Sequence, residues 1–238
     1  PHSRGDIERI VVVENPIEYT EPSQRTEIRI LYDDDALYIA ARMWDTEAEK
    51  IVSQNLRHGQ QVWGDDFFGI VLDPFNDQRS GYLFILNANG VRVEALYLDI
   101  SKQQWNWQGI WETAGTQDDQ GWSTEVAIPF KSLSFDPQND AWGINFRRQI
   151  ARNNEHVGWV SRNRTMNPSV TGVATGLRGL DQGLGLDIVP SVSAVGEKDF
   201  SASATESNVA PSLDLFYKVT PALNGALTIN TDFSATEV

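Results

Sequence analysis

The sequence predicts an all-β fold, a two-sheet antiparallel β-sandwich of the jelly-roll or immunoglobulin-like kind, followed by a C-terminal extension. Three observations support this class. Apolar residues recur at every second position, turn-forming residues separate the segments at short intervals, and only one segment suits a helix. The 238 residues are enough for one large β domain, or for a domain of about 150 residues with an appendage.

The first two predicted strands flank an acidic turn at residues 33–35. The strand before the turn places three apolar residues on one face: Ile28, Ile30 and Tyr32. The strand after the turn places four residues on one face: Leu37, Ile39, Ala41 and Met43. Side chains two residues apart share a face of a strand, so the pattern predicts a buried inner face for both.

Two central strands are predicted at 67–72 and 82–86, because these segments are apolar at consecutive positions and would be covered on each side. The period of two, with side chains assigned alternately to the two faces of a strand, returns at 91–98. Asn89-Gly90 lies between the last two segments and predicts a tight hairpin turn.

Further along the chain, turn-forming residues separate three more predicted strands, at 122–128, 142–150 and 157–160. One short helix is predicted near residues 47–56. There Thr46 would cap the first turn, and Glu49 three positions later would complete a capping box.

The composition changes after about residue 170, where glycine, serine and threonine become frequent. Two alternating segments follow, at 213–219 and 227–233. Such segments of about ten residues fit a transmembrane β-barrel hairpin, but they also fit a surface hairpin or a partly ordered tail. We therefore predict two regions, a β-sandwich over 1–170, and a linker with the start of a β-barrel-like region over 171–238.

Composition and motifs exclude several classes of function. A net charge of −14 repels phosphate backbones and argues against nucleic acid as a partner. The absence of cysteine excludes disulfides, zinc–thiolate sites and cysteine nucleophiles. His2, His58 and His156 lack metal-ligand spacing, and no nucleophile elbow, phosphate loop or zinc-protease helix occurs. Carboxylate pairs are too common in so acidic a chain to indicate a glycosidase, so we predict no enzyme activity.

The segment 105–111 contains three tryptophans that would face one side of an extended chain: Trp105, Trp107 and Trp111. Flat aromatic rings bind the C–H faces of sugars, and neighbouring amide side chains could contact the hydroxyl groups. Tryptophan is also highly buried on average, so the same rings could pack against the edge of the sandwich. The sequence leaves both interpretations open.

The motif Trp63-Gly64-Asp65-Asp66 precedes the first central strand. Trp63 is a candidate exposed platform, and Asp66 is a candidate acceptor for a ligand hydroxyl. Carboxylates at strand ends also cap turns or bind Ca²⁺, and the acidic turns at 33–35 and 73–77 raise the same question. None has the ligand spacing of an EF-hand loop, which favours solvated turns and leaves Ca²⁺ only as a candidate cofactor.

Arg147 and Arg148 belong to the only basic cluster of the sequence. They are adjacent on a predicted strand, so their side chains lie on opposite faces. We expect one of them to pair with an acidic neighbour, and the other to reach solvent or ligand.

The order of several motifs is similar to that of a known family. These motifs lie at 26–33, 37–39, 63–66, 72–73, 121–129 and 142–146. Their order and spacing resemble the family 9 carbohydrate-binding modules, a β-sandwich family, over roughly residues 25–165. The resemblance implies a β-sandwich whose ligand is a carbohydrate.

A version of this module that precedes the β-barrel of bacterial outer-membrane proteins is more similar still. The segments that fit it are 111–112, 128–133, 147–148 and 152–156. The tail from residue 213 resembles the first hairpin of such a barrel. This resemblance implies an exported protein of the cell envelope, in the periplasm or at the cell surface, with a C-terminal outer-membrane barrel of the same polypeptide as a partner.

In the family site, a sugar lies between two tryptophan rings, and Trp63 matches one of them. The second ring falls near 164–167, which hold no aromatic residue, and an apolar residue near Ile85 replaces a family arginine. The resemblance therefore implies the fold more strongly than the sugar specificity. Trp107 or Trp111 could replace the missing ring. The polar residues predicted to contact the sugar are Asp66, Asn87 and Arg147.

The predicted function is a non-catalytic carbohydrate-binding module that stacks an oligosaccharide or polysaccharide on exposed tryptophan. The alternative is a structural or protein-interaction domain that docks on the barrel, or gates it, without binding sugar.

Overall fold

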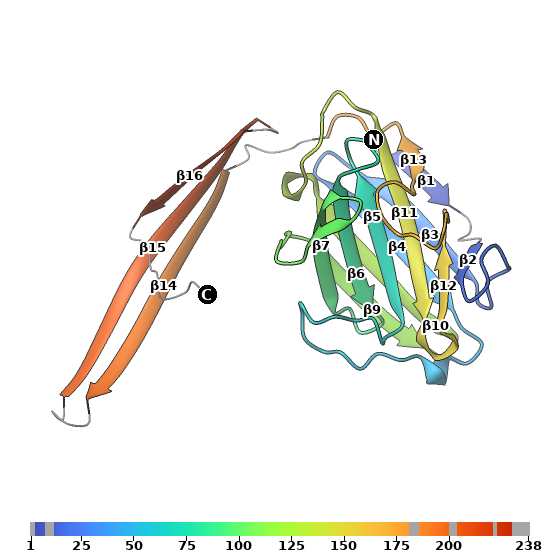
Figure 1. Cartoon of the computed structure of the whole chain (residues 1–238), viewed down its shortest axis with the longest axis horizontal. Helices are drawn as coiled ribbons and strands as arrows, with labels where there is room; N and C mark the ends of the chain where they lie inside the picture. The colour runs from blue at the N-terminus through green and yellow to red at the C-terminus, as the bar shows by residue number, and fades with distance from the viewer. Residues whose placement is uncertain (1–2, 8–11, 181–185, 200–203, 221–222, 230–238) are drawn as a thin grey trace. The chain divides into compact units, whose positions relative to one another are not determined.

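The computed structural model describes residues 3–7, 12–180, 186–199, 204–220 and 223–229. The chain divides into two compact units, Pro1–Gln182 and Gly183–Val238 (Figure 1). Nearly all regular structure in the described ranges is β-strand, and the only helices there are three short 3₁₀ turns, Ala48–Lys50, Phe130–Ser132 and Ala151–Asn153. The predicted all-β class is confirmed.

The first sheet of the Pro1–Gln182 unit has five strands in the order β1-β3-β4-β10-β9, and every neighbouring pair is antiparallel. We call it the five-stranded sheet. Its strands are β1 (Ser3–Ile7), β3 (Thr26–Tyr32), β4 (Ala36–Trp44), β9 (Glu112–Asp118) and β10 (Gly121–Pro129). The four apolar residues predicted to share one face of β4 are all buried.

The second sheet follows the order β2-β12-β11-β5-β6-β7-β8, and β13 pairs with β11 beside this path. We call it the eight-stranded sheet. Its strands are β2 (Val12–Asn15), β5 (Phe67–Asp73), β6 (Gly81–Asn87), β7 (Arg92–Asp99), β8 (Lys102–Gln104), β11 (Ala141–Ile150), β12 (Glu155–Gly158) and β13 (Gly172–Thr175). Its strand pairs are also antiparallel.

The main hydrophobic core lies between the two sheets, which pack face to face (Figure 1). Met43 and Trp122 enter it from the five-stranded sheet. Phe84, Trp142 and Phe146 enter it from the eight-stranded sheet. Because alternate residues of both sheets supply this core, the predicted two-sheet β-sandwich is confirmed.

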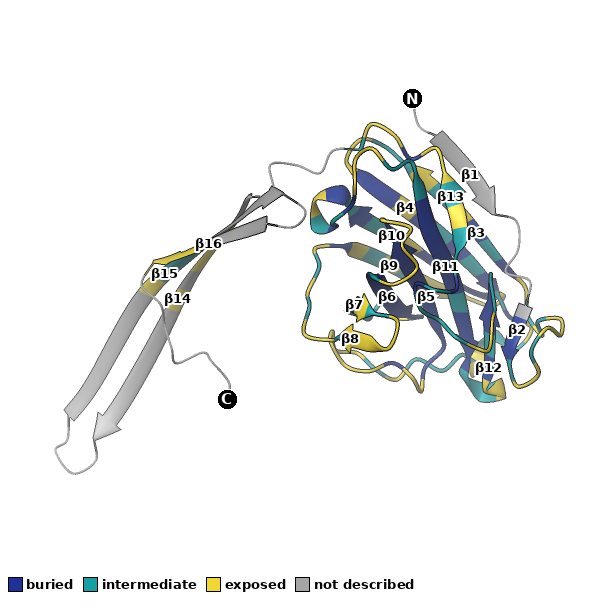
Figure 2. Ribbon diagram, turned by 45° about the horizontal axis from the view of Figure 1, so that its top comes forward, coloured by how far each residue is buried: buried dark blue, intermediate teal, exposed yellow. Residues whose placement is uncertain are grey.

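The strands β5 and β6 are buried at every position (Figure 2). A second apolar cluster covers the outer face of the eight-stranded sheet and explains this burial. Val71, Ile85 and Tyr97 belong to this cluster from the strands and Val62 belongs to it from a loop, while the partly buried Met166 packs against it. The prediction of two central strands covered on each side is therefore confirmed.

The predicted hairpin between β6 and β7 is also present. Gly90 adopts a φ of 76°, in the left-handed region that glycine enters without a steric penalty. The amide of Asn87 donates to the carbonyl of Val91 at 3.0 Å and closes the turn.

The predicted helix at 47–56 is wrong. Only the 3₁₀ turn Ala48–Lys50 forms, and Ile51 is already extended, with a φ of −60° and a ψ of 126°. Thr46 does not cap this turn. Its amide and hydroxyl instead form hydrogen bonds with the side chain of Gln24, both at 3.0 Å.

Two buried carboxylates hold residues 51–66 as an irregular loop. Asp65 and Asp66 accept hydrogen bonds from backbone amides of this loop, those of Val52, Gln54 and Asn55. A helix over the same residues would need these amides for its own ladder of hydrogen bonds. The carboxylates therefore replace the helix with a loop that lies against the sandwich.

The sandwich continues past the predicted boundary at residue 170. β13 pairs with β11 over four residue pairs. Leu177 is buried in the main core. The residues immediately after 170 therefore belong to the first unit and not to a linker.

The second unit contains a three-stranded antiparallel sheet, β14 (Leu186–Asp199), β15 (Ala204–Thr220) and β16 (Leu223–Ile229). The alternating segment predicted at 213–219 lies within β15. The segment predicted at 227–233 begins in β16, and its last residues lie outside the described ranges. β14 occupies part of the region predicted as a linker.

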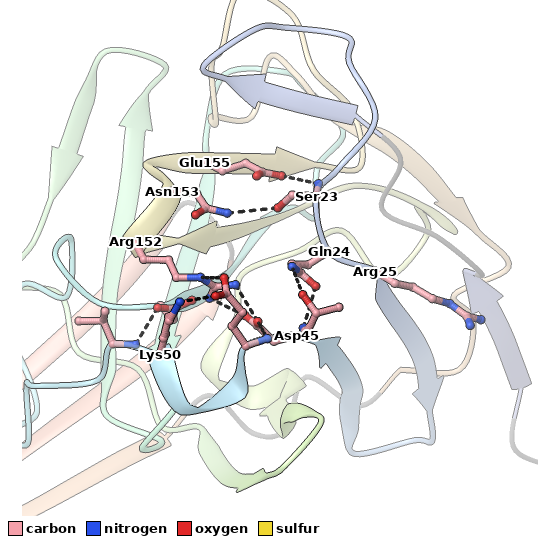
Figure 3. Close-up of polar contacts among 12 residues, drawn as sticks. Ser23, Gln24, Arg25, Asp45, Lys50, Arg152, Asn153 and Glu155 are labelled. Atoms are coloured by element: carbon pink, nitrogen blue, oxygen red, sulfur yellow. Dashed lines mark hydrogen bonds and ion pairs between the residues drawn. The ribbon is translucent and has the colours of Figure 1, made fainter.

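A buried ionic cluster joins the two sheets at one end of the sandwich. The fully buried Arg148 of β11 lies 3.6 Å from Asp45, which follows β4. It also donates to the carbonyl of Arg25 at 3.1 Å and to the hydroxyl of Thr26 at 3.2 Å. Arg152 donates two hydrogen bonds to the same Asp45, at 2.7 and 2.8 Å (Figure 3).

The electrostatic balance of this cluster keeps Asp45 ionised. Burial alone would raise the pKa of this carboxyl group, because the charged form loses its hydration. The hydrogen bonds from Arg152 and from the Glu47 amide, with the charges of Arg152 and Arg148, outweigh that effect and place the pKa below its usual value.

We predict that Asp45→Asn lowers the free energy of unfolding by about 3–5 kcal/mol, because it leaves two buried or half-buried guanidinium groups without their shared carboxylate. Urea denaturation followed by tryptophan fluorescence measures the change. Asp118→Asn is the control, since Asp118 pairs with Arg42 on the surface and its loss should have little effect. Equal stability of the two variants would contradict the role given to Asp45.

Candidate functional site

Two exposed tryptophans form an aromatic platform, the name we use for Trp63 and Trp105. Each residue is 42% exposed. Their centroids lie 5.7 Å apart, with the ring planes at 88°. Phe67 of β5 contacts Trp63 edge to face, also at 5.7 Å. Because tryptophan is usually well buried, a pair of exposed rings in contact favours a binding surface at this place.

The loop that carries Trp63 is held by Asp65. This buried carboxylate accepts hydrogen bonds from the amides of Gln54 and Asn55, both at 3.1 Å, and from the Asn55 side chain. Asn87 donates to the same carboxylate at 2.8 Å and to the Asn55 carbonyl at 2.9 Å. These contacts outweigh the effect of burial and lower the pKa of Asp65.

Asn87 and Asp66, predicted as polar contacts to a sugar, are both fully buried. The Asn87 side chain is used within the loop and in its own hairpin, where its oxygen accepts from the Val91 amide at 3.0 Å. Asp66 accepts from the Val52 amide at 2.9 Å, and burial raises the pKa of its carboxyl group. The structure therefore places both residues beneath the platform, where they support the loop.

A third buried residue joins the loop to the eight-stranded sheet. Gln149 of β11 donates to the carbonyl of Trp63 at 2.5 Å and to the carbonyl of Asp65 at 3.0 Å. The backbone on which the Trp63 ring stands is therefore fixed from the sheet as well as from the loop. A rigid backbone lowers the entropy cost of presenting the ring to a ligand.

Arg147, also predicted to contact a sugar, forms an ion pair with the buried Glu14 at 2.5 Å. It also donates to the carbonyl of Arg164 at 3.1 Å. Since Arg148 is paired with Asp45, both guanidinium groups have a carboxylate partner, where the sequence predicted one for only one of them. Nearby His156 has a pKa lowered to about 4 by burial and by the charge of Arg147, so its imidazole is neutral at pH 7.

The three tryptophans of the 105–111 segment have different environments. Trp105 belongs to the platform. Trp107 is half-buried and packs on Tyr82 and Phe84. Trp111 is 1% exposed and contacts Phe84 edge to face at 5.0 Å. Trp111 is therefore part of the core and offers no surface to a ligand, contrary to the prediction that it could replace the second ring.

The acidic turns proposed as Ca²⁺ sites use their carboxylates to hold backbone amides. Asp73 accepts from the amides of Asp77 and Gln78, and Asp33 accepts from the amides of Asp35 and Ala36. Within the described part of the chain, no three His, Cys, Asp or Glu side chains gather in a way that could hold a metal ion. No helix there is long and apolar enough to cross a membrane.

Residues 11–175 match the model of the carbohydrate family 9 binding domain-like family. The chain belongs to this family. The match covers more than half of the chain and contains the platform, the ionic cluster and every strand of both sheets except β1. No curated protein sequence matches the chain.

Solved structures are also similar to this family 9 domain. A Bacteroides uniformis protein to which carbohydrate binding has been attributed aligns with a TM-score of 0.55 and 14% identity, over 74% of this chain and 85% of that one. A family 9 module from Caldicellulosiruptor kristjanssonii, solved with cellotriose, aligns with a TM-score of 0.49 and 19% identity, over 66% of this chain and 76% of that one. The first of these similarities supports the fold.

The second stacking ring of the family site has no aromatic residue in its place in this family 9 domain. Near 164–167, where the resemblance places that ring, Met166 packs against the outer face of the eight-stranded sheet. A Cβ atom added to Gly69 would lie 2.8 Å from Met166 Cε, so the methionine side chain fills the space above this glycine. Tyr97 fixes the same segment by donating to the Met166 carbonyl at 2.7 Å.

The sequence assigned no specific role to Asp65, and it grouped Trp105 with Trp107 and Trp111 as rings that could either bind sugar or pack against the sandwich. Asp65 lies two residues before β5, a strand that is buried at every position, and a carboxylate there must find partners within the fold. Trp105 lies between polar Gln104 and Asn106, but Trp107 likewise lies between Asn106 and Gln108, so the sequence does not indicate which ring is exposed.

We predict that Asp65→Ala destabilises the fold by about 3 kcal/mol and loosens the loop, because several hydrogen bonds to one buried carboxylate are lost. Hydrogen–deuterium exchange should become faster at the Gln54 and Asn55 amides. Asp77→Ala, which removes a carboxylate that accepts three hydrogen bonds in the exposed turn at Arg79 and Ser80, is the control. Unchanged exchange in the Asp65 variant would contradict the prediction.

Proposed function

We propose that this family 9 domain is a non-catalytic carbohydrate-binding module that stacks a sugar ring on Trp63. The observation that carries the proposal is that the Trp63 ring is exposed while hydrogen bonds hold its backbone in place. The carboxylates next to it are turned inward and hold the loop, so the indole is the group that the motif presents to solvent. Membership of the family and the similarity to a Bacteroides uniformis protein attributed to carbohydrate binding point the same way.

The chemistry of the platform suits a neutral sugar. The C–H groups of a pyranose ring pack on an indole face, and an aromatic ring supplies a large contact area with little conformational entropy to lose. Trp105 stands nearly perpendicular to Trp63, so it can limit how a sugar lies on the first ring. The strongly acidic net charge disfavours polyanionic ligands.

We predict that Trp63→Ala weakens glycan binding at least about tenfold, or about 1.4 kcal/mol, because the stacking surface is removed. Calorimetry with glucose and cellotriose, together with a glycan array, measures the change. Tyr38→Ala removes an aromatic residue of similar exposure from the other sheet and is the control. Undiminished binding by the Trp63 variant would rule out this site.

A second candidate function, a protein-interaction domain, is favoured by the outer face of the five-stranded sheet. This face contains a shallow hollow of about 500 Å³. Its lining includes the apolar side chains of Leu31, Tyr38, Ala40, Ala114 and Ala127. If no glycan binds in the experiment above, this surface becomes the better candidate for docking on a barrel or another partner.

We also propose that the protein is associated with the bacterial outer membrane, where the second unit begins a barrel of the same polypeptide. Its described residues support this through one apolar row across three strands, Ile188–Leu215–Leu227. Two residues further along each strand, and therefore on the same face, lies a second apolar row, Pro190–Leu213–Ile229. Between these rows, Asp214 pairs with Val189 and Thr228, so the other face carries two polar residues and one apolar residue in this row. Apolar residues on one face and polar residues on the other are typical of transmembrane strands.

We predict that single cysteines at 227 and 229, carrying an environment-sensitive fluorophore, report an apolar environment when the protein is inserted into phospholipid vesicles. A cysteine at Thr228 should report water, because it lies on the opposite face. The chain has no native cysteine, so each label has one position. The same emission maximum at all three positions would contradict the membrane assignment.

A further inference from the structure

A groove of about 330 Å³ lies beside β7, next to the aromatic platform. It is formed by the Trp105–Gly109 segment, by β7 and by the loop that carries Trp63. The side chains that matter for binding are Gln61, Arg92, Glu94, Trp105, Trp107 and Gln108. This volume is at the lower end of the range for small-molecule sites. None of the sequence-predicted contacts except Trp107 lies in this groove.

Glu94 is the charged, half-buried group of the groove that lacks a partner among the described residues. Its side chain is half-buried, and it makes no hydrogen bond or ion pair with any residue that the structure describes. Most other shielded carboxylates of this domain, such as Asp65 and Asp73, accept several hydrogen bonds from their neighbours. A shielded acceptor without a partner favours a ligand that brings hydroxyl donors.

Arg92 supplies donors beside this acceptor. One of its nitrogens donates to the Trp111 carbonyl, and its guanidinium lies 5.7 Å from the Trp111 ring centroid. These contacts orient the side chain and leave further N–H groups of the planar fork for a ligand. A donor and an acceptor of opposite charge in one groove suit the hydroxyl groups of a neutral sugar.

The ring of Trp107 is held in place before any ligand arrives. It packs on Tyr82 at 5.2 Å and on Phe84 at 6.0 Å. It also lies directly over Gly109, where an added Cβ atom would be 2.6 Å from Trp107 Cη2. Only glycine at this position leaves room for the ring, so the wall of the groove is preorganised.

Trp105 connects the groove with the platform, because the same ring contacts Trp63 and lines the groove. We propose that a neutral oligosaccharide binds across both, with one sugar stacked on Trp63 and the following units in the groove against Trp107, Arg92 and Glu94. This inference rests on the proposed stacking at Trp63 and adds a preference for chains over single sugars.

The test is calorimetry with gluco-, xylo- and manno-configured sugars of one to four units. In the series that binds, we expect the tetrasaccharide to bind at least about tenfold more tightly than the monosaccharide. Glu94→Gln keeps the shape of the side chain and removes its charge, and Gly109→Ala displaces the Trp107 ring. Both variants should bring the ratio of the two affinities close to one.

Matched controls separate these effects from general damage. Glu125→Gln changes a carboxylate on β10, in the other sheet, and Gly64→Ala adds a methyl group with no atom within 4 Å. Both should keep the full ratio, and thermal melting shows that each variant is folded. Trp63→Ala should instead weaken binding of every sugar length.

The outcomes distinguish the two proposals. A ratio near one in the unaltered protein, or a full ratio in Glu94→Gln, overturns the groove and leaves stacking on Trp63 standing. Undiminished binding in Trp63→Ala overturns the stacking site itself. Absence of binding in all three series overturns both.

Discussion

The buried guanidinium of Arg148 is the constraint on which this domain depends. It projects from β11 and reaches the start of β3 and the end of β4, so it bridges the two sheets of the sandwich. Burial lowers its pKa to about 10, which still leaves it charged at pH 7 and makes nearby carboxylates necessary. Asp45 pairs with it, and Asp66 adds a second negative charge from the loop.

The same arrangement determines how Trp63 is presented. Asp65 and Asp66 point inward because both satisfy loop amides and Asp66 also faces the buried cations, and the neighbouring indole is left outside. The polar groups closest to the exposed ring therefore have structural roles. Specificity for a ligand has to come from side chains farther away, and Glu94 and Arg92 in the groove beside β7 have the chemistry for it.

The domain keeps the family fold while changing the surface above the eight-stranded sheet. Met166 and Ile85 form an apolar layer where the resemblance places a stacking ring and an arginine. Such a layer stabilises the sheet, since β5 and β6 become buried on both faces. It also removes polar contacts from that face, which is consistent with a ligand site displaced toward Trp105 and the edge of β7.

The sequence by itself determined the strands and their faces. A period of two assigns each side chain to one side of a sheet, as in β4, and Asn89-Gly90 specifies its hairpin. The tertiary structure decided which tryptophan is exposed, why residues 51–66 form a loop, and that Asn87 and Asp66 are buried. Periodicity gives the direction of a side chain, but its burial depends on which distant segment packs over it. Trp105 and Trp111 differ for this reason, since only Trp111 is covered by the opposite sheet and its neighbours.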